Sequence, residues 1–369
     1  MRLHCPLLLG AFVATAYGHG NLEARREFLA SHTNNLNHCG SINKDSGLYQ
    51  RAIERREALI DHLLAERRLQ RRQVSSVNTP HKSDKPYTAS TAPSVVFAGN
   101  KSCVLSPETT EGPFYVTGES IRTNLVDGQL GVPLHLDIQV IDVNTCLPLN
   151  GTFLEMWSAN TTGVYSGALA IPNGSGMGDK ANLNKQFLRG IQKTDDDGVV
   201  QFQTIFPGHY TGRATHIHVI THLNAKAEAN NTVFNTKVTH NGQAFFDQDL
   251  IDKVEKTAPY NTNKQTGTKN AKDDILLQEA ATADPFFEYV LLGSDLKDGI
   301  FAWFSFGVNP KLYRGIMAVA ENLKGGGKMK TDNPKLQGFD GLFPGGFPTS
   351  WQPGFGPSPT MNAVTPTKS

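Results

Sequence analysis

The residues best suited to chemistry lie between positions 207 and 219, where the sequence reads PGHYTGRATHIHV. Within the nine residues from Tyr210 to His218, shortly after a Pro-Gly turn signal, the chain carries a phenol, a guanidinium and two imidazoles. These groups belong to Tyr210, Arg213, His216 and His218. Successive side chains of a β-strand point to opposite faces, so a strand that buries Ile217 and Val219 directs both histidines to the other face. Two imidazoles on one strand face are half of a metal site.

A second tyrosine is placed to extend this set. Tyr165 lies in a glycine-flanked loop, TGVYSG, directly after a predicted strand. A phenol has a pKa of about 10, so its ionisation near neutral pH requires a strongly charged cation. Two tyrosines and two histidines therefore favour ferric iron over zinc or magnesium. Taken alone, a His-x-His strand is more often a solvated polar face, and Arg213 could simply pair with a carboxylate in a turn.

The elements around these residues are predicted to be short strands separated by loops rich in Gly, Asn, Asp and Pro. The strand candidates are residues 134–141, 152–157, 198–204, 214–221, 232–238, 286–292 and 300–306. Clear helical runs are few among them. Many short strands with turn punctuation predict a mainly β fold, with a β-sandwich catalytic domain over residues 97–308.

Segments of different character flank this domain. Residues 1–18 read as a signal peptide, with a positive start, an apolar run and a small-x-small cleavage site. Residues 19–72 form a helical N-terminal segment, which either packs on the main domain or a second subunit or is a pro-segment removed after Arg72. Residues 73–96 are a Ser/Thr/Pro-rich linker. Residues 309–369 form a C-terminal extension, largely low in complexity, with a Gly/Pro-rich tail that we expect to be disordered or draped.

The signal peptide predicts a secreted protein, because no later apolar run is long enough to span a bilayer. Secretion would remove Cys5 and leave one disulfide and one odd thiol; we expect Cys103 to pair with Cys146, since both flank the first predicted strands, although sequence leaves connectivity open. Glycosylation sequons agree with this compartment, at Asn100, Asn150, Asn160, Asn173 and Asn230. A net charge of +1 gives no sign of a nucleic-acid partner.

Four stretches closely resemble the intradiol ring-cleavage dioxygenases of the catechol and protocatechuate type, especially their secreted single-domain branch. They are LSPETTEGPFY at 105–115, GVYS at 163–166, FLRGIQ at 187–192 followed by Thr194-Asp195, and residues 207–219. They occur in the family's order within roughly residues 100–305. The resemblance implies that Tyr165, Tyr210, His216 and His218 bind a non-haem Fe(III).

The same resemblance implies roles for other residues. Arg213 matches an arginine that faces the substrate and stabilises negative charge, and Gln243 sits where the family has a glutamine near the metal. Glu111 and Arg189 are expected to anchor loops. The loop between Tyr210 and His216 is shorter than in the protocatechuate enzymes, so a preference for a ring carboxylate is not carried over.

The implied reaction inserts O2 between the two hydroxyl-bearing carbons of a small aromatic diol to give a muconate-type diacid, with Tyr210 as the local base. Two alternatives belong to other classes. A mature chain starting at His19 could bind copper through its amino terminus and imidazole, as in secreted polysaccharide monooxygenases. The domain could instead be a non-catalytic sandwich that binds aromatics or glycans. The diol itself and the oligomeric state stay open.

Overall fold

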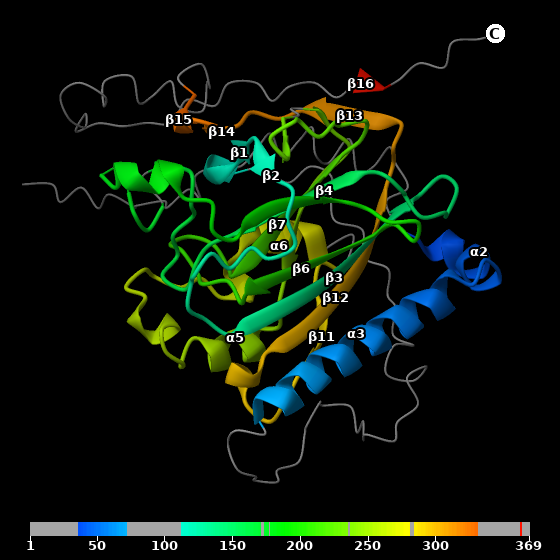
Figure 1. Ribbon diagram of the computed structural model, residues 1–369, viewed down its shortest axis with the longest axis horizontal. Coiled ribbons are helices and arrows are strands. Elements are labelled where there is room, and N and C mark those ends of the chain that lie inside the picture. Colours follow the sequence, from blue (N-terminus) through cyan, green and yellow to red (C-terminus); the bar gives the residue numbers. More distant parts are fainter. Residues whose placement is uncertain are drawn as a thin grey trace, which may run out of the picture.

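The computed structural model describes residues 36–71, 112–170, 173–176, 178–234, 237–280, 284–330 and 362–363. The signal peptide, His19, Cys103, Glu111, the predicted linker and most of the tail lie outside the described residues. Two four-stranded sheets form the centre of the molecule (Figure 1). The first has the order β11 (Glu288–Leu291), β12 (Ile300–Val308), β3 (Pro133–Asp142) and β6 (Val199–Ile205). The second has the order β10 (His240–Phe245), β7 (His216–His222), β4 (Phe153–Ser158) and β5 (Arg189–Lys193).

The two sheets pack face to face, which confirms the predicted β-sandwich. Alternate residues of β3, such as Leu136 and Ile138, point inward and contact a single apolar core. Leu154 of β4 and Ile217 and Val219 of β7 enter the same core from the other sheet. The alternation arises because successive side chains of a strand point to opposite faces, so the residues between these positions face outward.

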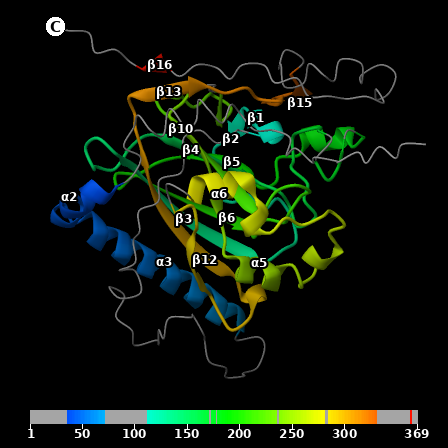
Figure 2. The same cartoon turned by 180° about the vertical axis from the view of Figure 1, so that it is seen from behind.

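Shorter strands and helices surround the sandwich. The remaining strands are β1 (Val116–Thr117), β2 (Glu119–Ser120), β8 (Thr232–Val233), β9 (Lys237–Val238), β13 (Leu312–Gly315), β14 (Ala320–Leu323), β15 (Gly326–Met329) and β16 (Asn362–Ala363). The α-helices are α2 (Gly40–Asp45), α3 (Leu48–Arg71), α5 (Gln248–Val254) and α6 (Asp274–Ala280). The 3-10 turns are η1 (Asn37–Cys39), η2 (Gly112–Phe114), η3 (Lys180–Asn184), η4 (Tyr260–Thr262), η5 (Asn270–Lys272) and η6 (Leu296–Asp298). Seen from behind in Figure 2, α6 lies in front of the strands.

Most predicted strands occur close to their predicted bounds, but three details differ. The predicted strand at 232–238 is two short strands, β8 and β9. Two strands of the central sheets were not predicted, β5 and β10, because their sequences RGIQK and HNGQAF contain few β-branched residues. Strands β13 to β15 continue past residue 308, so part of the predicted low-complexity extension is ordered β structure.

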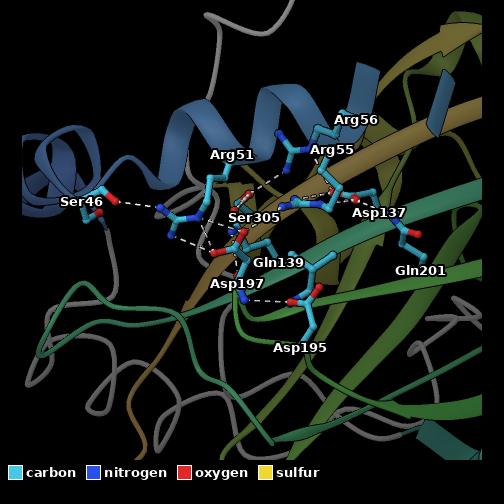
Figure 3. A network of polar contacts seen from close by, with 11 residues as sticks. Ser46, Arg51, Arg55, Arg56, Asp137, Gln139, Asp195, Asp197, Gln201 and Ser305 are labelled. Carbon is cyan, nitrogen blue, oxygen red and sulfur yellow. Dashed lines mark hydrogen bonds and ion pairs between the residues drawn. The ribbon is translucent and has the colours of Figure 1, made fainter. Parts of the chain in front are cut away.

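Helix α3 covers the outer face of the sheet that contains β3 and β12 (Figure 1). Leu63 of the helix packs against Phe301 and Trp303, the outward-facing residues of β12. The polar part of the interface is drawn in Figure 3, where Arg55 and Arg56 reach the buried carboxylate of Asp137. The helix therefore lies against the main domain, one of the two placements expected for the N-terminal segment.

The predicted disulfide between Cys103 and Cys146 is wrong, because Cys146 is bonded to Cys39. Cys39 precedes α2, and an apolar cluster that includes Leu36 and Leu48 surrounds both sulfur atoms. Docking of the N-terminal helices thus brings together two cysteines 107 residues apart, which proximity along the chain could not indicate. In the described part of the chain, no helix combines the length and apolar character needed to cross a membrane.

Candidate metal centre

Strand β7 carries both predicted histidine ligands and lies between β4 and β10 in its sheet. His216 and His218 are buried on the face opposite Ile217 and Val219, as the alternation predicted. Because β7 is hydrogen-bonded along both edges, its backbone is held firmly and the two imidazoles share one fixed surface. The ring of Trp157 from β4 lies flat on the ring of His218, with centroids 4.5 Å apart.

The side chains proposed as ligands converge at one point. His216 Nε2 lies 3.1 Å from His218 Nε2 and 3.4 Å from the hydroxyl oxygen of Tyr165. The ring of Tyr210 lies 5.4 Å from that of Tyr165 and 5.7 Å from that of His216, measured between centroids. All four side chains are buried. The fold thus gathers residues from the loop after β4, the loop before β7 and β7 itself.

Both histidines are in the neutral form that a metal needs. The Nδ1 atom of His216 lies 2.6 Å from the carbonyl oxygen of Ala214. Because a carbonyl oxygen can only accept a hydrogen bond, Nδ1 carries the proton and Nε2 carries the lone pair. Burial and the nearby Arg213 charge lower the pKa of His216 to about 3. Burial lowers the pKa of His218 as well, and the charge on the nearby Arg213 acts in the same direction.

The spacing of these atoms fits a shared cation. Two nitrogen ligands, each about 2.1 Å from one ion and at right angles, would be about 3 Å apart. Burial raises the pKa of Tyr165 well above its usual value, and burial also raises that of Tyr210 although Arg213 opposes the shift. Neither phenol would ionise here without a strong positive charge beside it. The donor set therefore fits a hard, highly charged metal ion.

Arg213 lies beside the four candidate ligands and is held from two sides. Its Nε atom donates to Asp273 Oδ2 at 2.9 Å, and its Nη2 atom donates to the side-chain oxygen of Gln243. Gln243 lies opposite His218 in the β10–β7 ladder, so the strand pairing brings this predicted residue to the site. Arg213 is 7% exposed, and its bonds to Asp273 and Gln243 fix the guanidinium in place before any substrate arrives.

The sequence profile of a family described as "Dioxygenase" matches residues 110–249. An intradiol ring-cleavage dioxygenase from Tetranychus urticae is 31% identical, over 56% of this chain and 96% of that one, with a TM-score of 0.47. The chain belongs to the intradiol ring-cleavage dioxygenase family.

Two further solved structures are similar to this dioxygenase. The dioxygenase domain of a carbohydrate-binding fusion from Streptomyces sp. SirexAA-E is 25% identical, over 55% of this chain and 96% of that one, with a TM-score of 0.34. Catechol 1,2-dioxygenase from Pseudomonas arvilla C-1 is 20% identical, over 54% of this chain and 60% of that one, with a TM-score of 0.32. No curated protein matches the chain.

The main site residue that sequence reasoning missed in this dioxygenase is Asp273. Besides binding Arg213, its carboxylate accepts hydrogen bonds from the backbone N–H of Ala214 at 2.7 Å and from those of Ile275 and Leu276 at 3.0 Å. It therefore ties the start of α6 to the loop that precedes β7. The pair Asp273-Asp274 before the apolar run ILL is a helix-start signal, which could have indicated the helix but not the bond to the arginine.

Aromatic and basic neighbours complete the surroundings of the dioxygenase site. Phe114 stacks on Tyr165 at 4.4 Å between centroids and meets Tyr210 edge-on at 5.4 Å. Arg189 was expected to anchor loops, and it donates to the carbonyl oxygens of Ser166 at 2.8 Å and Phe114 at 2.6 Å. These two bonds join the loop that carries Tyr165 to the turn that carries Phe114.

Proposed function

We propose that this dioxygenase is an extracellular, non-haem Fe(III) enzyme that cleaves a catechol-type aromatic between its two hydroxyl-bearing carbons. One observation carries the proposal: His216 Nε2 lies 3.1 Å from His218 Nε2 and 3.4 Å from the buried hydroxyl oxygen of Tyr165, next to the second buried phenol of Tyr210. Tyr165, Tyr210, His216 and His218 would hold the ion. Nitrogen donors alone would suit many metals, whereas phenolate oxygen favours a ferric one.

A ferric ion at this position would acidify both hydroxyls of the bound diol and activate the ring toward O2. Tyr210, held as a phenolate, would accept a proton from the substrate, and the adjacent Arg213 guanidinium would stabilise that phenolate beforehand. Arg213 would stabilise the negative charge that develops on the ring, since it stays charged and its position is set by Asp273 and Gln243. Phe114 would flank the ring and help to exclude water.

The proposal extends to the class of diol that the enzyme would cleave. Catechol and hydroxyquinol both fit the donor set, and similar solved structures include a catechol 1,2-dioxygenase and a hydroxyquinol 1,2-dioxygenase. The loop between Tyr210 and His216 is shorter than in the protocatechuate enzymes, so the proposal includes no preference for a ring carboxylate. O2 is the second substrate, and the product is a muconate-type diacid.

Secretion is supported by two independent features of the chain. Residues 1–18 have the composition of a signal peptide. The Cys39–Cys146 disulfide joins the N-terminal helices to the main domain, and such bonds persist in oxidising compartments. Mass analysis of the protein recovered from culture medium would give the mature N-terminus, and retention inside the cell would contradict this part of the proposal.

The enzyme proposal is tested by metal analysis, visible absorption and oxygen uptake on the purified protein. We expect about one iron per chain, a tyrosinate-to-iron band in the visible and oxygen consumption with catechol-type substrates, with the product identified by mass. A colourless protein that stays inert after ferric reconstitution would overturn the proposal.

A pair of variants on one strand sharpens this test. His218→Gln should lose iron and colour, whereas His222→Gln should keep both. His222 lies on the same face of β7, is equally buried and binds Glu155 at 2.8 Å instead of facing the cluster. Equal iron contents in the two variants would remove His218 from the ligand set.

A further inference from the structure

The segment between α5 and α6 lies outside the part of the chain that the family profile matches, yet it contacts both loops that bear the candidate tyrosine ligands. We name these loops the first tyrosine loop, residues 160–165, and the second tyrosine loop, residues 207–213. The side chain of Gln265 is hydrogen-bonded to both of them.

The amide of Gln265 uses its donor and its acceptor on different loops. Its Nε2 atom donates to the carbonyl oxygen of Thr162 at 2.9 Å and to that of Gly163 at 3.2 Å. Its Oε1 atom accepts from the backbone N–H of Thr211 at 3.1 Å. Thr162 is three residues from Tyr165, and Thr211 directly follows Tyr210. One side chain therefore links the backbones next to both candidate tyrosine ligands.

The backbone around Gln265 is itself fastened to the second tyrosine loop. His209 Nε2 lies 3.0 Å from the carbonyl oxygen of Gln265, and Asn263 Nδ2 donates to the carbonyl oxygen of His209 at 2.8 Å. Asn263 Oδ1 also accepts from the backbone N–H of Gln265 at 3.0 Å. Gln265 is thus presented from a short, internally bonded turn, and not from a free loop.

The contact with the first tyrosine loop is close enough to require glycine. Gly163 has a φ of +77°, and a Cβ built there would lie 2.0 Å from Gln265 Nε2 and 2.3 Å from the carbonyl oxygen of His209. A side chain at this position would force the loops and Gln265 apart. The two tyrosine loops and the amide therefore pack at a separation that leaves no room for adjustment.

We propose that Gln265 is a positioning residue that sets the separation of Tyr165 and Tyr210. The inference rests on the proposed function only for its effect on catalysis. That effect requires both tyrosines to bind one ion at fixed distances. A misplacement of about 1 Å can reduce turnover about 100-fold in an enzyme. The arrangement of the loops is a property of the protein without metal and can be measured separately.

The experiment compares Gln265→Ala and Gln265→Glu with Asn270→Ala. Asn270 is the matched control, because its amide also donates from the same segment to a backbone carbonyl, that of Phe246 at 2.9 Å, but contacts neither tyrosine loop in the described structure. The Glu variant keeps the volume of the side chain and places a carboxylate against two carbonyl oxygens. It tests the inference even if Gln265→Ala folds poorly.

Two readouts are expected to change in the Gln265 variants and not in the control. In metal-free protein, amide exchange at Thr211 and over residues 160–164 should speed up about fivefold or more, because the loop contacts are lost. In iron-loaded protein, kcat should fall about tenfold or more with little change in KM, and the tyrosinate band should shift.

The outcomes separate this inference from the enzyme proposal. If the wild-type protein binds no iron, the proposed function fails while the exchange measurement still decides whether Gln265 holds the loops. Exchange rates that match those of Asn270→Ala would overturn the inference, whatever the activity. Faster exchange with unchanged kcat and an unchanged band would overturn it too, since the separation of the tyrosines would then not depend on Gln265.

Discussion

Removal of the Asp137 carboxylate should destabilise the protein strongly, because this group is the electrostatic centre of the helix α3 interface (Figure 3). Asp137 is fully buried in β3 and accepts from Arg56 Nε at 3.0 Å and from Arg55 Nε at 2.9 Å. Gln201 Nε2 adds a further bond at 3.0 Å. The Asp137→Ala variant would leave Arg56, which is also fully buried, without its counter-charge.

The expected size of this effect follows from the burial of the pair. Removing one partner of a buried ion pair costs about 3 to 5 kcal/mol, because the other charge remains in a medium that solvates it poorly. Asp197→Ala is the matched control on the same interface: its partner Arg51 is 47% exposed, and pairs of that kind contribute about 0 to 1 kcal/mol. The two variants should therefore differ by at least about 2 kcal/mol.

Urea unfolding followed by tryptophan fluorescence measures this difference. Trp303 is a suitable reporter, since Arg56 lies over its ring at 5.9 Å and Leu63 of α3 packs on it. The double variant Arg56→Met with Asp137→Leu should recover most of the loss, because it removes both buried charges. If Asp137→Ala and Asp197→Ala unfold at the same urea concentration, the buried pair does not hold the helix and the reasoning is refuted.

Acid should reproduce the same effect in the wild-type protein. Burial alone would raise the pKa of Asp137, but the Arg56 charge and the Arg55 hydrogen bond outweigh it, so the pKa lies below its usual range. A depressed folded-state pKa gives stability that is complete above the unfolded value, about 3.9, and is lost as the pH falls through the folded value. The stability difference between wild type and Asp137→Ala should therefore shrink below about pH 4 and stay constant above it.

Three further variants test the site and the disulfide. Arg213→Ala should keep iron but lower kcat about 100-fold by oxygen uptake, and unchanged turnover would remove Arg213 from the reaction. Asp273→Asn should keep iron and lower kcat by a smaller factor, since it weakens the hold on Arg213 without removing the guanidinium; iron loss instead would show that Asp273 supports the ligands. Cys39→Ser removes the disulfide that closes a loop of 107 residues, so the free energy of unfolding measured in urea should fall by about 2 to 5 kcal/mol. No change would mean that docking of the helices, without the disulfide, holds the two ends of this loop together.

The candidate site was predictable where its geometry is local. The spacing of His216 and His218 around Ile217 places both imidazoles on one strand face, whatever the rest of the fold does. The positions of Tyr165 and Arg213 depend on loops, so strand alternation could not place them. The order of the motifs shared with the family identified them instead. The β-sandwich itself followed from the number of short strands and the turns between them.

What could not be predicted depends on contacts between distant parts of the chain. Asp273 lies 60 residues after Arg213, and nothing in its local sequence distinguishes it from an ordinary helix-start residue. The partner of Cys146 depends on where α2 and α3 dock, which is decided by burial of Arg56 and Leu63 against the outer face of a sheet. Such pairings are properties of packing and leave no periodic signal in the sequence.

The two outward faces of the sandwich bury polar groups for different reasons. Beneath α3, both carboxylate oxygens of Asp137 are bonded to cations. On the ligand face, His218 Nδ1, Gln243 Nε2 and Trp157 Nε1 are buried without a hydrogen-bond partner among the described residues. Each such atom costs about 1 to 3 kcal/mol, which a fold tolerates where a ligand or ordered water will later meet the group. Metal and diol would bind on the face that carries the four candidate ligands, so they should protect that face from local opening more than the α3 face.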